Sequence, residues 1–188
     1  RFRRLSGLTA AIQLRGLGHD VTVFEKSRGP GGRLAAKRVT GGSADMGAQY
    51  FTSRNPDFLP FLHKFAGPES FGPWEGRFGF QTNADKWESF PEETRYVGIP
   101  RMTAITRALS GHAHVVTETR VARLARNDQS WSLFSTAGSH LGDFDAVIVT
   151  APPAQARELL ADSGLDALAS HLDEPVSRVL PCWAVAAH

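Results

Sequence analysis

Residues 5–25 read LSGLTAAIQLRGLGHDVTVFE, and this stretch decides the fold. Its first part carries apolar side chains at helical spacing and ends near Gly18, a residue type that commonly follows a helix. Residues 21–24 are β-branched or aromatic, as in a short strand, and Glu25 follows directly. A helix, a short connection and a strand form the later part of a βαβ unit. The stretch therefore predicts an α/β fold with a Rossmann-like, nucleotide-binding domain.

The start of the helix carries part of a glycine fingerprint. In a dinucleotide-binding fold, three glycines precede or open the first helix, and an acid follows the next strand to bind a ribose. Gly7 fits the third glycine and Glu25 fits the acid, but Phe2 and Arg4 stand at the other two glycine positions. We interpret this as a truncated or altered N-terminus. For Gly7 taken alone, ordinary helix packing is the alternative.

The loop after the strand is the more specific signal. Glu25 is followed by Lys26, Arg28, the pair Gly31-Gly32, and Arg33. Glycines allow the backbone to approach a ligand closely, and an arginine presents a fork of donors to phosphate. The loop therefore predicts a phosphate site beside a ribose-binding acid. A solvated turn with surface arginines is the alternative interpretation.

Patterns in the rest of the chain predict further helices and strands. We expect helices over 56–66, 102–109 and 153–160, and short strands within 37–53, 71–81, 96–100, 114–117, 120–126 and 130–135. Residues 145–150 are almost continuously apolar, as in a strand covered on both faces. Because the chain opens directly on a helix and closes on an apolar run, we expect a fragment that is incomplete at both ends.

Composition limits the class of protein. Of the 188 residues, 41% are hydrophobic and 21% are charged, with a net charge of +2, which is typical of a globular protein. The sequence has no stripe of basic residues of the kind that binds nucleic acid. It also has no apolar run long enough to span a bilayer. The single cysteine, Cys182, cannot form a disulfide within the chain, so we expect a reducing, cytoplasmic setting.

Two further segments extend the pattern of residues 25–33. Residues 45–52 read DMGAQYFT, and residues 96–104 read YVGIPRMTA. Together with residues 25–33, they resemble the FAD-dependent amine-oxidase superfamily, and most of all its bacterial renalase-like branch. That branch usually has a glycine where Arg101 stands. The apolar stretch from Ala146 to Pro153 resembles the strand that rejoins the FAD-binding domain of this superfamily.

The resemblance implies a set of FAD-binding residues. Glu25 would bind the adenosine ribose, Arg33 the phosphates, and Val121 the adenine through its backbone. Gln49 and Tyr50 would lie close to the flavin ring. The full set of implied cofactor-binding residues is Gly7, Glu25, Lys26, Arg28, Gly31, Gly32, Arg33, Gly47, Ala48, Gln49, Tyr50, Val121 and Ala151.

The resemblance also implies a domain plan and an activity. Residues 1–53 and 101–174 would form a discontinuous FAD-binding domain, and residues 54–100 and 175–188 part of a smaller, β-rich substrate domain. The activity would be oxidation of dihydronicotinamide isomers of NAD(P)H, with hydride transfer to FAD and reoxidation by oxygen. A flavin amine oxidase and a truncated, non-catalytic remnant are the alternatives. A nicotinamide-dependent dehydrogenase is disfavoured, because it requires the intact glycine fingerprint.

Other candidate residues carry weaker signals, and the sequence identifies no catalytic residue. His112 and His114 share a strand face, but no third ligand is evident, so we interpret them as surface histidines. Asp45 fits a turn-forming residue better than a general base. Four aromatic residues either pack in a sheet, which we favour, or wall a substrate pocket: Trp74, Phe78, Phe80 and Trp87.

Overall fold

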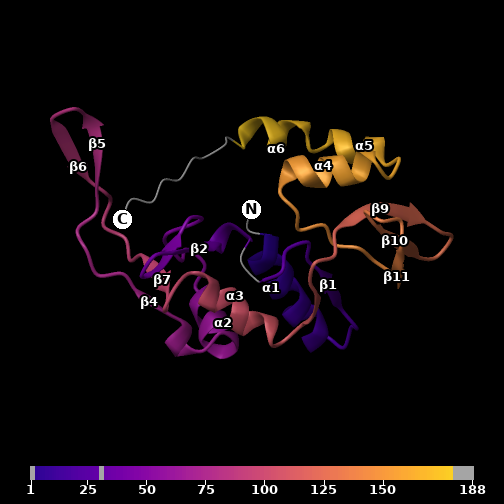
Figure 1. Ribbon diagram of the computed structural model, residues 1–188, viewed down its shortest axis with the longest axis horizontal. Coiled ribbons are helices and arrows are strands. Elements are labelled where there is room, and N and C mark those ends of the chain that lie inside the picture. The colour runs from indigo at the N-terminus through magenta and orange to yellow at the C-terminus, as the bar shows by residue number, and fades with distance from the viewer. Residues whose placement is uncertain (1–2, 30–31, 180–188) are drawn as a thin grey trace.

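The computed structural model describes residues 3–29 and 32–179 of the chain. Figure 1 shows an elongated arrangement in which the N-terminal helix lies near the middle, a hairpin projects at one end, and a small sheet with three helices occupies the other. The chain mixes helices and short strands, as an α/β fold requires. Each group of elements positions a different part of the candidate site.

The N-terminal unit has the predicted order of helix, connection and strand. Helix α1 spans Arg3–Gly16, and strand β1 spans Thr22–Phe24. Gly18, with φ 91°, lies in the connection in a left-handed conformation that disfavours other residue types. Strand β1 pairs in parallel with β8, His114–Val116, so that Phe24 lies opposite Val116. Parallel pairing of strands far apart in sequence is the arrangement that a Rossmann-like sheet uses.

Three helices meet in the main hydrophobic core. Helix α2 spans Phe58–Phe65 and α3 spans Thr103–Ser110. Leu8 and Ile12 of α1, Leu62 of α2, and Ile105 and Leu109 of α3 belong to one buried cluster. Helix α3 contacts both α1 and α2, so it lies at the centre of this core. Helix α2 belongs to the expected substrate region yet shares this core, and the domain division itself stays a prediction.

Short antiparallel pairs fill the middle of the chain. They are β2 (Ala36–Val39) with β3 (Gly42–Asp45), β4 (Phe71–Pro73) with β7 (Tyr96–Gly98), and β5 (Gly79–Asn83) with β6 (Lys86–Ser89). One 3-10 turn, Gly32–Leu34, precedes β2, and a second, Pro68–Ser70, precedes β4. The β5–β6 hairpin projects from the molecule in Figure 1. Trp87 lies in strand β6 of this hairpin but is 69% exposed, so the expectation of core packing is wrong for this residue.

The C-terminal part forms a meander followed by helices. Strands β9 (Val121–Arg126), β10 (Trp131–Ser135) and β11 (His140–Phe144) form an antiparallel sheet in the order β11-β10-β9. Helices α4 (Pro153–Ala161), α5 (Asp166–Ser170) and α6 (Asp173–Arg178) follow. Strand β11 was not predicted, because its sequence HLGDF contains a glycine and polar residues and forms a strand only through pairing with β10.

The predicted strand over residues 145–150 is wrong. These residues lie outside every strand and ladder in the described part of the chain. The apolar, β-branched pattern is present, and Ile148 is nevertheless 61% exposed. A segment becomes a strand only when a neighbouring strand accepts its backbone hydrogen bonds, and within residues 3–29 and 32–179 no strand lies alongside it.

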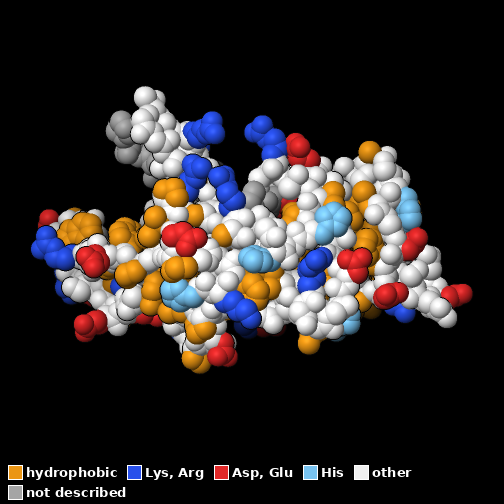
Figure 2. Space-filling view, turned by 90° about the horizontal axis from the view of Figure 1, so that it is seen from below, with side chains coloured by type: hydrophobic (Ala, Val, Ile, Leu, Met, Phe, Trp, Pro, Cys, Tyr) orange, Lys and Arg blue, Asp and Glu red, His pale blue; other side chains and the backbone are white. Residues whose placement is uncertain are grey.

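The surface carries both signs of charge. Figure 2 shows acidic and basic side chains intermingled on the face that it presents, with orange hydrophobic side chains between them. Among the described helices, none combines the length and the apolar character that crossing a bilayer would demand.

Candidate functional site

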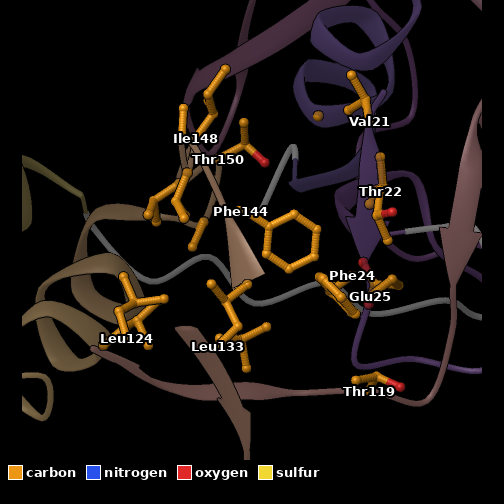
Figure 3. Close-up of a pocket in the computed structure, with 18 of the residues that line it drawn as sticks. Val21, Thr22, Phe24, Glu25, Thr119, Leu124, Leu133, Phe144, Ile148 and Thr150 are labelled. Atoms are coloured by element: carbon orange, nitrogen blue, oxygen red, sulfur yellow. The ribbon is translucent and has the colours of Figure 1, made fainter. Parts of the chain in front are cut away.

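A large cavity lies beside β1. Its volume is about 1020 Å³, and its walls come from α1, β1, β9 and residues 145–151 (Figure 3). Five of the residues predicted to bind a cofactor line it together: Gly7, Glu25, Lys26, Val121 and Ala151. They are more than 140 residues apart at the extremes of the sequence, so only the tertiary structure brings them to one place.

The backbone and side chain of Glu25 are held in the wall of this cavity by hydrogen bonds. The residue is only 7% exposed and follows the last residue of β1. Its Oε1 accepts a hydrogen bond from the Ser27 backbone N–H at 2.8 Å. Its own N–H donates to the Val116 carbonyl at 2.8 Å, and its carbonyl accepts from Thr119 N–H at 2.9 Å. Bonds on both sides hold the carboxylate at the carboxyl end of the strand, where ligands bind in open α/β sheets.

A second loop closes against the loop of Glu25. Glu118 has a φ of 55°, and its N–H donates to the Ser27 carbonyl at 3.3 Å. Thr119 and Arg120 then line the cavity beside Val121. Arg120 also pairs with Glu158 of α4 at 2.9 Å. Sequence reasoning missed Thr119 and Arg120 as lining residues, although their position directly before the predicted strand was a usable signal.

The glycine-rich loop is described in part. Gly32 has a φ of 53° and begins the 3-10 turn Gly32–Leu34, so the backbone takes a conformation that glycine permits. Arg28 is exposed and does not line the cavity. Gly31 and the side chain of Arg33 lie outside the described residues. The predicted phosphate site therefore stays a prediction for these two residues.

The second predicted group lies elsewhere. Gly47, Ala48, Gln49 and Tyr50 follow β3, and none of them lines the cavity beside β1. Gly47 N–H donates to the Ala35 carbonyl at 3.2 Å, which ties this loop to the start of β2. A nucleotide in the cavity and a ring near Tyr50 would thus occupy two separate regions, as an elongated cofactor would.

Tyr50 belongs to an aromatic cluster around a buried arginine. Arg95 is 6% exposed, and its guanidinium lies 4.6 Å from the Phe78 ring, 5.0 Å from Phe90 and 5.5 Å from Tyr50. Its terminal nitrogens donate to the carbonyls of Glu93 and Pro91. Within the described part of the chain, Nε has no hydrogen-bond partner and no carboxylate pairs with the guanidinium. Ring faces and carbonyl oxygens therefore stabilise this charge in place of an acid.

Asp45 joins two elements rather than facing the cavity. Both carboxylate oxygens accept from Met102 N–H, at 3.2 and 3.3 Å, at the residue before α3. Burial raises the pKa of Asp45, against the opposing effects of the Met102 hydrogen bond and the charge of Arg101. The hydrogen bonds with Met102 give Asp45 a structural role, because they connect the end of β3 to the start of α3.

His112 and His114 belong to no metal-binding cluster in the described part of the chain. Among residues 3–29 and 32–179, no three His, Cys, Asp or Glu side chains are grouped to hold an ion. His112 instead contacts Phe65 edge to face, with ring centroids 5.4 Å apart. His114 lies in β8 and is exposed.

The cavity fits one end of a flavin nucleotide. A buried carboxylate at the end of β1 suits the hydroxyls of a ribose, and the backbone of Val121 lies on the same wall. Lys26 supplies a positive charge beside Glu25 that suits a phosphate, while the charge of Arg120 is paired with Glu158. The donors present therefore match the group that the sequence predicts.

The fold is the Rossmann-like α/β type that the sequence predicts, and its cavity brings together five of the predicted cofactor-binding residues. Residues 5–75 match the family model described as flavin-containing amine oxidoreductase. This match supports the amine-oxidase superfamily, and the flavin that it names agrees with the predicted FAD. The renalase-like branch rests on sequence resemblance alone.

Solved structures of putrescine oxidase share the fold. A triple mutant from a redesign of cofactor binding superposes with a TM-score of 0.66 at 14% identity, covering 84% of this chain and 58% of that one. The wild-type enzyme bound to putrescine gives a TM-score of 0.64 with the same identity and coverage. The chain thus spans 58% of the length of these structures, less than two thirds. At this identity the likeness shows the fold alone.

Proposed function

We propose that the chain is the FAD-binding part of a flavin-dependent oxidoreductase. The observation that carries the proposal is the buried carboxylate of Glu25, held at the carboxyl end of β1 inside a cavity that Val121 and Ala151 also line. An acid at the carboxyl end of the strand that follows the first helix is where dinucleotide-binding folds place the acceptor for the ribose hydroxyls. The match of residues 5–75 to a flavin-containing family supports the same cofactor.

Each part of the site has a proposed role toward the nucleotide. Glu25 binds the ribose, the backbone of Val121 holds the adenine, and Gly7 lets α1 pack closely beside the nucleotide site. Lys26, Gly31, Gly32 and Arg33 bind the diphosphate, and Gly47, Ala48, Gln49 and Tyr50 lie along the ring. When bound, the flavin supplies the two-electron acceptor, while the protein supplies binding and orientation.

Removing the charge of Glu25 tests the cofactor. In a titration of the purified chain with FAD, followed by quenching of flavin fluorescence, Glu25→Gln is expected to weaken binding about 10–100-fold. The loss follows because a neutral amide accepts weaker hydrogen bonds from the ribose than a carboxylate does.

Asp20→Asn is the matched control. Asp20 lines the same cavity at the opposite end of β1 and is exposed, so its neutralisation should leave FAD affinity unchanged. Equal affinities of the wild type and Glu25→Gln would contradict the assignment of the ribose acid. A wild-type chain that remains colourless with excess FAD would support the non-catalytic remnant instead.

For the substrate, we propose a dihydronicotinamide isomer of NAD(P)H. Arg95 provides the supporting observation, since a buried cation beside Tyr50 repels an ammonium group and attracts the phosphates of a dinucleotide. An amine substrate is the second candidate, favoured by the structural likeness to an oxidase solved with putrescine.

Reduction of bound flavin separates the two substrate classes. Stopped-flow bleaching of the FAD-loaded protein is expected with dihydronicotinamide isomers and not with putrescine. Arg95→Met, which keeps a long apolar side chain among the rings, should slow only the reaction with the anionic dinucleotide. Faster bleaching by putrescine than by any dihydronicotinamide would establish the amine alternative.

A further inference from the structure

A second hollow lies at the base of the β5–β6 hairpin, the element that projects from the molecule in Figure 1. Its volume is about 640 Å³, and the residues that line this hairpin groove are Arg77, Phe78, Gly79, Trp87, Glu88 and Ser89. None of the six lines the cavity beside β1, so the nucleotide proposed for that cavity does not occupy the groove. The groove is therefore a candidate for a different ligand.

Trp87 is the unusual side chain of this groove. The other aromatic residues of the hairpin region pack in pairs, Trp74 with Phe78 at 5.0 Å and Phe80 with Phe90 at 5.4 Å between ring centroids. The indole of Trp87 contacts no other ring in the part of the chain that the structure describes, and the residue is 69% exposed. Its flat surface is therefore available to stack on a planar ligand.

A glycine keeps the floor of the groove open next to this indole. Gly79 lies opposite Ser89 in the hairpin, and Trp87 is two residues from Ser89, so the three share one face. A Cβ at Gly79 would lie 3.1 Å from the Glu88 carbonyl oxygen and 3.7 Å from Cε3 of Trp87. The six-membered ring of the indole therefore lies next to a strip of backbone that carries no side chain.

The groove also contains one uncompensated positive charge. The carboxylate of Glu88 pairs with Lys86 at 2.8 Å, which neutralises the acid of the groove. Arg77 is exposed and forms no ion pair with any residue that the structure describes. A guanidinium presents a fork of donors that matches a phosphate. A planar stacking surface and a phosphate donor on one small hairpin are the combination that binds a nucleotide.

Phe78 connects the groove with the aromatic cluster around Arg95. Its side chain lines the groove, and its ring lies 4.6 Å from the Arg95 guanidinium. Tyr50, which we propose to lie close to the flavin ring, contacts the same cluster, 6.1 Å from Trp74. Rings and cations thus follow one another from Tyr50 through Arg95 to the groove. A dinucleotide has the same order, since a diphosphate joins its two bases.

We propose that the hairpin groove binds the adenosine phosphate end of the dinucleotide substrate, with the purine stacked on Trp87 and the adjacent phosphate paired with Arg77. This inference rests on the proposed function, because a dihydronicotinamide dinucleotide has a second base and putrescine has neither a base nor a phosphate. Trp87 and Arg77 are then specificity-determining residues, and the dihydronicotinamide remains on the side of Tyr50.

Adenosine 5′-monophosphate (AMP) tests the groove directly. The titration uses the full chain loaded with FAD, so that the cavity beside β1 is already occupied. AMP is expected to shift the indole N–H resonance of Trp87 in NMR spectra. In calorimetry, Trp87→Ala and Arg77→Gln are each expected to weaken AMP binding about 5–100-fold, the first because one base–aromatic stack is lost. Trp87→Phe keeps a stacking ring and should restore most of the affinity.

Arg107→Gln is the matched control for the loss of charge. Arg107 is an exposed arginine of α3 and does not line the groove, so its neutralisation should leave the affinity for AMP unchanged. Because Trp87 and Arg77 are both exposed, their substitutions should also leave the Tm of the chain unchanged. Loss of AMP binding in these variants therefore reports on the groove and not on folding.

The length of the substrate provides a second test in stopped-flow reduction of the bound flavin. A dihydronicotinamide dinucleotide is compared with the corresponding mononucleotide, which lacks the adenosine phosphate. In Trp87→Ala, the half-saturating concentration of the dinucleotide, divided by that of the mononucleotide, is expected to rise about 5–100-fold over the wild-type ratio. An unchanged ratio would overturn the proposal.

Three further outcomes are decisive. Equal AMP affinities of the wild type, Trp87→Ala and Arg77→Gln would overturn the nucleotide site. Binding of oligoadenylate that tightens with its length would overturn the proposal in favour of single-stranded nucleic acid. A shift of the Trp87 resonance by AMP in a chain that binds no FAD, or that is reduced by putrescine alone, would overturn the proposed function and support the nucleotide site.

Discussion

Two aspartates show how single residues respond to their surroundings. Burial raises the pKa of Asp45 and outweighs the hydrogen bond from Met102. The hydrogen bond from Ser132, followed by that of His140, lowers the pKa of Asp143. The pKa of a carboxyl group is therefore raised by desolvation at Asp45 and lowered by hydrogen-bond donors at Asp143.

The two shifts predict opposite effects of pH on stability. The stabilisation from Asp45 is present below its unfolded value of 3.8 and is lost as the pH rises through its higher folded pKa. The stabilisation from Asp143 is present above 3.8 and is lost as the pH falls through its lower folded pKa. Carboxyl ¹³C NMR titration of the folded protein should place Asp45 above 3.8 and Asp143 below it. A reversed order would contradict the two environments.

At the scale of elements, α3 holds the core together. Leu109 is fully buried in the cluster that α3 forms with α1 and α2. We expect Leu109→Ala to lower the free energy of unfolding by about 2–5 kcal/mol, because the cavity that it leaves is only partly filled. Urea unfolding measures the change.

Leu17→Ala is the control for this prediction. Leu17 follows α1 and is 76% exposed, so its truncation should change stability by no more than about 0.5 kcal/mol. Equal losses for the two variants would mean that the three helices do not share one core.

Elements with a strong local pattern were predicted from the sequence. The helices α1 and α3 and the strand β1 lie close to the bounds predicted from their apolar periodicity and β-branched residues. Strand β11 was not predicted although it forms, and residues 145–150 were predicted to form a strand that is not present in the described part of the chain. Each depends on whether a neighbouring strand is present, which no local pattern reports.

Across the whole molecule, the candidate site combines residues from distant parts of the chain. Gly7, Glu25 and Lys26 could be selected from the sequence because their motif is local. Arg120 and Thr119 line the same cavity only because β8 pairs with β1 and brings the following loop to Glu25. The cage of rings around Arg95 likewise joins Tyr50, Phe78 and Phe90 from three separate segments.

The sequence by itself determined the helix–strand unit at the start of the chain and the acid that follows it. Helical spacing, β-branched residues and glycines act on the backbone locally, so they can be recognised without knowledge of the fold. The tertiary structure alone decided that Glu25 is buried, that Arg95 lies among aromatic rings, and that residues 146–149 belong to no strand in the described part of the chain. Burial, cation–π contacts and strand pairing are properties of neighbours, and those neighbours are remote in the chain.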